Sequence, residues 1–257
     1  MLERYFELER HKTTVRTEIL AGVTTFMTMA YIIFVNPQIL ADAGMDRGAV
    51  FVATCLAAAL ASALMGLYAN YPIALAPGMG LNAYFTYSVV LGMGHSWQTA
   101  LGAVFLSGIL FLIVSLTRIR EWVIDSIPLS LKLAIAAGIG LFLAIIGLKS
   151  AGIIQGSEAT LVTLGDLKSL PVVLAVLGFL VMVALDARGI PGAIIIGILA
   201  VTAVGIALGV NSFGGIVSMP HSIAPVFLQL DILGALEVGL IAIVFPFFFV
   251  DVFDNTG

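Results

Sequence analysis

The sequence has very little charge: only 10% of its 257 residues are charged, and 61% are hydrophobic, with a mean hydropathy of +1.15. Soluble domains carry about 25% charged residues. This chain therefore has too few charged residues to form the surface of a water-soluble domain. A helix that crosses a hydrocarbon layer about 30 Å thick needs roughly 20 apolar residues, so the chain has room for about eight spans. We expect one all-α polytopic membrane domain.

Cysteine and histidine are also scarce. The single cysteine, Cys55, lies in an apolar stretch, which excludes an intrachain disulfide and a cysteine-based metal site. The three histidines, at positions 11, 95 and 221, fall in tails or loops, where they are poorly placed for a proton relay inside a membrane. There is no metal-ligand spacing, nucleophile with a positioned base or phosphate-binding loop, so we expect neither an enzyme nor a cofactor.

The apolar runs predict eight segments, near 17–40, 48–69, 81–94, 97–117, 127–149, 170–186, 190–209 and 232–254. Residues 1–16 are charged and lack an apolar core, so they form a tail rather than a signal peptide. Leu2, Tyr5 and Phe6 would let this tail lie on the membrane surface as a short amphipathic helix.

The positions of lysine and arginine predict the orientation. With a cytoplasmic N-terminus, eight basic residues fall on the inner side and three on the outer side, which fits the excess of basic residues in cytoplasmic loops. The count requires the third segment to cross completely, because a re-entrant loop would put Arg118, Arg120 and Lys132 outside. A net charge of −4, with the basic residues set between apolar runs, gives no indication of a nucleic-acid partner.

The third segment breaks the rules of a bilayer interior. The stretch 70–80 contains Pro72 and Pro77 and cannot run as a regular helix, so we expect extended backbone followed by a half-helix. Irregular backbone is tolerated at membrane depth only inside protein or beside a watery cavity. The amides of Gly78, Met79 and Gly80 would then face a polar cavity, as in transporter sites.

Asn82, one turn into the half-helix, offers a donor and an acceptor that match the edge of a heterocycle. The alternative is that proline and glycine merely kink a spanning helix and that Asn82 bonds a neighbour.

The end of the chain, residues 245–257, places acids after an apolar run. Asp251 and Asp254 are three apart, so on a helix they share a face. Desolvation and mutual repulsion disfavour ionisation of both, so one can carry a proton while the other accepts N–H donors from a ligand. The alternative puts both acids in solvent at the cytoplasmic mouth of the helix. Five phenylalanines, among them Phe249, offer ring faces, although lipid contact or packing accounts for most of them.

These stretches resemble the AzgA-like purine permeases, a branch of the nucleobase:cation symporter-2 family. The resemblance covers the whole chain: residues 14–22, 29–32 and 36–37 match the first helix, residues 76–85 the third segment and residues 251–257 the eighth. It implies a transporter of fourteen segments in two inverted repeats of seven, with core and gate domains and short strands in the third and tenth segments. The first repeat would occupy 17–209 and the second would begin at 232–257.

The resemblance also implies the site. The purine would lie between the two strands, with Asn82, Asp251 and Asp254 as substrate-binding or proton-coupling residues and Gly78–Gly80 as the strand-side contact. Thr25 and Ala30 on the first helix are further candidates.

The resemblance implies proton-coupled import of adenine, guanine or hypoxanthine across a cell membrane. The chain ends inside or just after the eighth segment, so the expectation is that it does not transport by itself unless a second chain completes it. Three alternatives stay open: transport of uracil, xanthine or a small anion, a passive channel, and a structural or inactive fragment. The sequence also leaves open whether the chain forms a homodimer.

Overall fold

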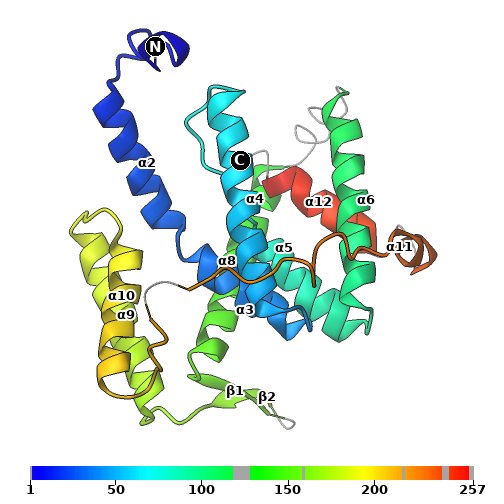
Figure 1. Ribbon diagram of the computed structural model, residues 1–257. Helices are drawn as coiled ribbons and strands as arrows, with labels where there is room; N and C mark the ends of the chain where they lie inside the picture. Colours follow the sequence, from blue (N-terminus) through cyan, green and yellow to red (C-terminus); the bar gives the residue numbers. More distant parts are fainter. Residues whose placement is uncertain (1, 118–127, 158–159, 216–217, 239–242, 255–257) are drawn as a thin grey trace. The chain divides into compact units, whose positions relative to one another are not determined.

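The computed structural model describes residues 2–117, 128–157, 160–215, 218–238 and 243–254 (Figure 1). The chain folds into two compact units. Unit 1 comprises residues 1–34, 55–76 and 145–219, and unit 2 comprises residues 35–54, 77–144 and 220–257. Each unit gathers segments that are far apart in the sequence, so tertiary contacts rather than local sequence build its core.

Unit 1 is built largely from long apolar helices. Its helices are α1 (Leu2–Tyr5), α2 (Val15–Met29), α9 (Leu170–Ala187) and α10 (Ala193–Ala207). Three more run from one unit into the other: α3 (Ile32–Asp42), α4 (Arg47–Leu67) and α8 (Leu129–Ser150). Gly178 on α9 lies against Val201 of α10, and Gly197 on α10 lies against Met182 of α9. Small residues allow the two backbones to approach closely, which helix packing in a membrane requires.

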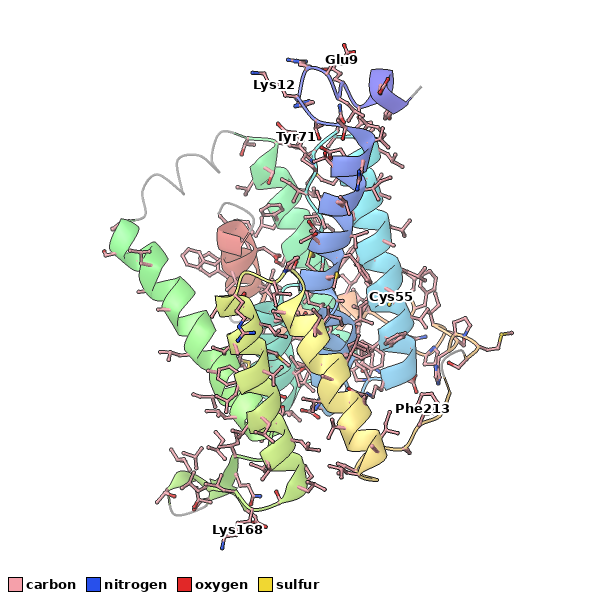
Figure 2. All side chains as sticks on the ribbon, turned by 90° about the vertical axis from the view of Figure 1, so that its left-hand side faces the viewer. Glu9, Lys12, Cys55, Tyr71, Lys168 and Phe213 are labelled. Carbon is pink, nitrogen blue, oxygen red and sulfur yellow. The ribbon has the colours of Figure 1, made fainter. Side chains whose placement is uncertain are left out.

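The charged side chains of unit 1 collect at its ends. Figure 2 shows Glu9 and Lys12 at one end of this unit and Lys168 at the other, with apolar helices between them. Large apolar side chains on these helices, such as Leu60, Leu64 and Phe179, are mostly exposed. An apolar surface of this extent between two charged ends fits a hydrocarbon layer rather than water.

Four helices among the described residues are long and apolar enough to cross a membrane: Val15–Asp42, Arg47–Leu67, Trp97–Ser115 and Leu170–Ala187. They correspond to the first, second, fourth and sixth segments predicted from the sequence. Two shorter apolar helices, Gly140–Ser150 and Ala193–Ala207, lie in the fifth and seventh. The multi-pass membrane protein expected from composition is therefore what the helices form.

The third segment begins irregularly, as predicted. Residues 70–78 have no regular hydrogen-bonding pattern, and they lead into α5 (Met79–Ala83), which continues as a π-helix, η1 (Tyr84–Gly92). The half-helix begins at Met79, so Asn82 lies about one turn into it, as predicted. The strand that the family resemblance implies here is not observed in the described residues. Extended backbone forms a strand only when it pairs with another segment, and residues 70–78 have no such pairing among the described residues.

The described strands lie elsewhere, in a hairpin of β1 (Ile154–Ser157) and β2 (Leu161–Leu164). They pair antiparallel, with Ile154 opposite Leu164 and Ser157 opposite Leu161. These residues lie between the fifth and sixth predicted segments, and strands of four residues are too short to show a clear alternation of apolar and polar residues.

The core of unit 2 forms where the third and eighth segments meet α6 (Trp97–Ser115). The eighth segment contains two described helices, α11 (Ile232–Val238) and α12 (Phe245–Asp254), and α12 packs along α6 (Figure 1). Val89, Ala103 and Phe247 are almost completely buried at this junction. The residues that the sequence singles out on α5 and α12 therefore come from elements of one packed core.

Candidate functional site

Ser62 on α4 satisfies the backbone of the irregular stretch within unit 1. Its hydroxyl donates to the carbonyl of Leu75 at 3.1 Å, and its oxygen accepts the N–H of Leu75 at 2.9 Å. Backbone groups at membrane depth need such partners, because each unsatisfied group costs several kcal/mol in hydrocarbon. This serine therefore satisfies both backbone groups of Leu75, a residue of the irregular stretch.

Gly78 ends the extended stretch in unit 2. Its φ of −74° and ψ of 119° are extended, and it caps α5 without a side-chain bond. Met79 is buried and Gly80 is half-buried, while the carbonyl of Gly78 accepts the N–H of Asn82 at 3.3 Å. Contact between these three backbones and a substrate stays a prediction.

Asn82 is part of a relay of polar side chains from three helices. Its Nδ2 donates to Oδ1 of Asn36 on α3. Nδ2 of Asn36 donates to Oγ1 of Thr54 on α4 at 2.7 Å, and Thr54 donates to the carbonyl of Val50 at 2.7 Å. Asn36 and Thr54 are 3% and 4% exposed, whereas Asn82 is half-buried. Asn82 therefore bonds a neighbour, as the alternative interpretation had it, although the segment is not a kinked continuous helix.

Asp251 on α12 is tied to α6. The hydroxyl of Ser107, which is completely buried, donates to Oδ2 of Asp251 at 3.1 Å. The carboxyl group is half-buried rather than fully solvated. The sequence analysis did not identify Ser107, whose only signal is a hydroxyl in an apolar run.

One aromatic contact joins α12 to the third segment, and a second lies within α12 itself. Phe247 is buried and meets Tyr84 of η1 edge to face, with 5.1 Å between ring centroids. Phe249 stacks on Phe245 at 5.8 Å and 25°. One face of Phe249 is thus occupied by a neighbouring ring. Because α12 also contacts α5, the helices that carry Asp251 and Asn82 pack against each other.

The other predicted residues are less informative. Asp254 lies on α12 three positions after Asp251, so the helix predicted for the pair is present, but its side chain lies outside the described part. Thr25 and Ala30 belong to unit 1. The hydroxyl of Thr25 donates to the carbonyl of Ala21 in its own helix at 2.9 Å, and Ala30 is buried at the end of α2. A substrate role for these three stays a prediction.

Asp231, which the sequence analysis also missed, fixes the start of the eighth segment. Its Oδ1 accepts the N–H of Gly234 at 2.9 Å, and its Oδ2 accepts the hydroxyl of Thr99 on α6 at 3.2 Å. An acid directly before an apolar run is a helix-start signal, so this role was detectable. Gly102 on α6 lies directly under the Asp231 backbone.

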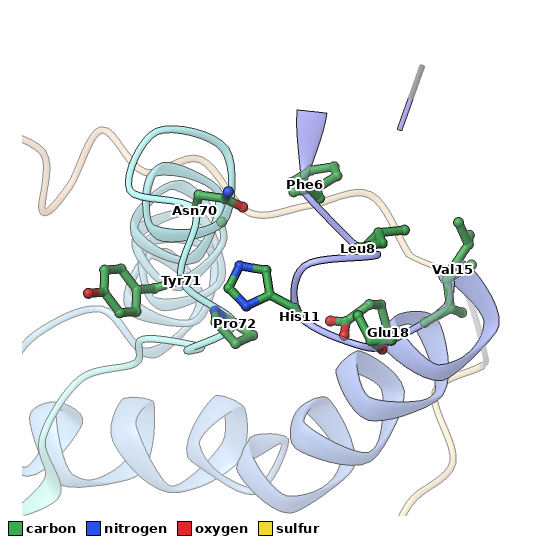
Figure 3. A pocket seen from close by; sticks show the side chains of 11 residues that line it. Phe6, Leu8, His11, Val15, Glu18, Asn70, Tyr71 and Pro72 are labelled. Atoms are coloured by element: carbon green, nitrogen blue, oxygen red, sulfur yellow. The ribbon is translucent and has the colours of Figure 1, made fainter. Parts of the chain in front are cut away.

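A cavity of about 600 Å³ lies within unit 1, between the N-terminal segment and the end of α4 (Figure 3). Its walls are mostly apolar, and His11 and Glu18 contribute ionisable groups. None of the predicted site residues lines this cavity. In the described part of the chain, no group of three or more His, Cys, Asp or Glu side chains is arranged to hold a metal ion.

Comparison with known proteins gives the family. The model of the Permease family matches residues 16–257. A protein of Methanocaldococcus jannaschii is 61% identical over 257 residues, which are all of this chain and 59% of that protein. The adenine permease AdeP of Escherichia coli K12 is 49% identical over all of this chain and 58% of its own length. The guanine/hypoxanthine permease PbuO of Bacillus subtilis is 45% identical, over 98% of this chain and 60% of its own length.

The chain spans about 59% of the length of the relatives it matches. The family model covers all but the first 15 residues, including both stretches on which the resemblance rested. The matched proteins are permeases rather than enzymes. The chain therefore belongs to the Permease family.

Proposed function

We propose that this chain is part of a permease that carries purine nucleobases (adenine, guanine or hypoxanthine) across the cell membrane together with protons. The relatives AdeP and PbuO are named for adenine and for guanine and hypoxanthine, which supports a purine ligand. Nucleobases are planar and carry N–H donors and ring acceptors, so a site for them needs ring faces, amides and carboxylates.

The observation that carries the proposal is the junction of α5 and α12 in unit 2. These helices contact each other, and they bring an amide on Asn82 and a carboxyl group on Asp251 into one packed unit. A carboxyl group inside a membrane is energetically costly and therefore rare, so its presence there favours a functional role. Asp251 would accept N–H donors from the purine or carry the coupled proton, with Asp254 as its partner on the same helix.

Ser107 orients Asp251. Its buried hydroxyl donates to Oδ2 of the acid at 3.1 Å, which fixes one side of the carboxyl group. Gly78, Met79 and Gly80 would supply backbone contacts to the purine, and Phe249 a ring edge.

The test is uptake of labelled adenine, guanine and hypoxanthine into proteoliposomes, by this chain expressed with its native flanking sequence. An imposed proton gradient, acidic outside, should drive accumulation. Asp251→Asn should abolish accumulation while the protein still inserts and remains abundant. Accumulation at the wild-type rate in that variant would sink the assignment of Asp251, and uptake indifferent to the gradient would favour a channel. Competition by uracil, xanthine and small anions separates the other substrate classes.

The positions of lysine and arginine along the sequence support one orientation. We propose a cytoplasmic N-terminus, because most lysines and arginines then lie inside. Since Cys55 is the only cysteine, Cys55→Ala gives a background in which Glu9→Cys and Lys168→Cys can each be labelled alone. A membrane-impermeant maleimide should reach position 168 in intact cells and position 9 only after permeabilisation. The reverse pattern would overturn the orientation.

Light scattering of the purified protein would show whether it is a homodimer.

A further inference from the structure

In the relay from Asn82 to Thr54, chemistry determines which group donates each hydrogen bond and which accepts it. A half-turn of an asparagine side chain exchanges its oxygen and nitrogen, so the donors must be assigned from a neighbouring group whose donor role is unambiguous. Thr54 is that group. Its hydroxyl has one hydrogen, which it donates to the carbonyl of Val50 one turn earlier in α4, at 2.7 Å.

Because the hydrogen of Thr54 is used in this bond, its oxygen can only accept from Asn36. The amide of Asn36 must therefore turn Nδ2 toward Thr54, and the two atoms lie 2.7 Å apart. This leaves Oδ1 of Asn36 facing Asn82, where it accepts from Nδ2 of Asn82. Asn36 and Thr54 are almost completely buried, so solvent does not compete for these bonds.

The direction decides what Asn82 offers to a ligand. With one N–H of Nδ2 bound to Asn36, the free edge of Asn82 presents Oδ1, an acceptor, and one remaining N–H. In the reversed relay Oδ1 would face Asn36, and both N–H groups would point outward, leaving no acceptor. Asn82 is half-buried, unlike the other two, so its free edge can be reached.

We propose that Thr54 and Asn36 are positioning residues that hold Asn82 with its carbonyl oxygen toward the ligand, so that the site selects a nucleobase bringing an N–H donor to this oxygen. This inference rests on the proposed function, since it concerns the purine site. Thr54 lies 28 residues before Asn82 and acts through Asn36 alone. Its effect is on selectivity rather than on the existence of the site.

The experiment measures how well two unlabelled analogues compete with labelled adenine for uptake by the chain with its native flanking sequence. Purine lacks the 6-amino donor of adenine, and 9-methyladenine lacks the ring N–H. Absence of adenine uptake in the wild type would refute the proposed function itself, before selectivity is measured. In the wild type, at least one analogue should compete about tenfold less well than adenine. In Asn82→Ala, adenine and that analogue should compete equally well. The group that the analogue lacks is then the N–H donor that Asn82 binds.

Thr54→Val keeps the shape of the side chain but removes the hydroxyl. The amides of Asn36 and Asn82 can then turn, so the preference for adenine over that analogue should fall about threefold to tenfold. Asn36→Ala should lower it equally, and the double variant should lower it no further, because both act on one relay. Thr54→Ser keeps the hydroxyl and should stay within about twofold of the wild-type ratio.

The matched control is Thr202→Val on α10, where the threonine also donates only to its own helix, to Ile198 at 2.7 Å. In this control, the preference for adenine over the analogue should equal that of the wild type. If Thr54 had a merely structural role, Thr54→Val would lower adenine uptake but leave this preference unchanged. If Thr54→Val fails to reach the membrane, the measurement on Asn36→Ala tests the proposal instead. The proposal is overturned if the variant tested prefers adenine over the analogue as strongly as the wild type does, or if the wild type itself shows no such preference.

Discussion

The hydroxyl of Ser107 donates a hydrogen bond to Oδ2 of Asp251, at 3.1 Å, and thereby joins α6 to the helix that carries the acid. The serine is completely buried, so water cannot take its place at this contact. A hydrogen bond from a buried hydroxyl to a carboxyl group orients the acid. The eighth segment is thus positioned by a residue of the fourth.

Replacing Ser107 with alanine removes this donor and leaves Asp251 with one partner fewer. We expect Ser107→Ala to lower the maximal rate of proton-driven adenine uptake by about tenfold to 150-fold, corresponding to about 1.5–3 kcal/mol for a hydrogen bond to a charged group. Initial rates over a range of adenine concentrations, at two external pH values, measure the effect and its dependence on protonation.

The control lies on the same helix. The hydroxyl of Ser115 has no hydrogen-bond partner among the described residues, so Ser115→Ala should leave uptake unchanged. If Ser115→Ala lowered adenine uptake as much as Ser107→Ala, the loss would reflect any change from serine to alanine in α6. The hydrogen bond from Ser107 to Asp251 would then have no specific role.

Ser62 offers a second test, because one hydroxyl serves both backbone groups of Leu75. Ser62→Ala leaves an N–H and a C=O without this partner inside the membrane, at a cost of about 1–3 kcal/mol for each group. Hydrogen–deuterium exchange of the peptide that contains Leu75 should become faster, and adenine uptake should fall. Ser62→Thr keeps the hydroxyl and should restore slow exchange. Unchanged exchange in the alanine variant would mean that Leu75 does not depend on Ser62.

Composition and spacing were enough to predict several apolar membrane helices and the place where one segment is irregular. The low charge predicted a multi-pass protein, and the prolines at 72 and 77 predicted the irregular stretch that the structure shows. Both features are local, since a bilayer imposes length and apolarity on each helix separately. The acids of α12 were visible for the same reason, because an acid in an apolar run is exceptional.

The partners of these residues were not predictable from one sequence. Asn36, Thr54 and Asn82 lie on three helices and up to 46 residues apart, so their relay exists only after α3, α4 and α5 have packed. A single hydroxyl in the sequence does not predict a hydrogen bond to another helix. A serine or threonine in a helix commonly donates to a carbonyl of its own helix, as Thr24 and Thr202 do. Ser107 escaped notice for the same reason.

The close contact between Gly102 on α6 and the backbone of Asp231 gives a test of how the eighth segment is held. A methyl group at position 102 would overlap with the carbonyl of Asp231, a backbone atom that can move only if α11 shifts away from α6. We expect Gly102→Ala to lower the stability of the detergent-solubilised protein by about 1–3 kcal/mol, as overpacking does, and to lower uptake through displacement of Asp251. Gly108 lies on the same helix with nothing within 4 Å of an added methyl group, so Gly108→Ala is the matched control. Because alanine favours helix over glycine by about 1 kcal/mol, the control should melt at the wild-type temperature or above it. If Gly102→Ala melted as high as Gly108→Ala, the eighth segment would not depend on close packing at this point, and its position would have to be set by Ser107 and Thr99 alone.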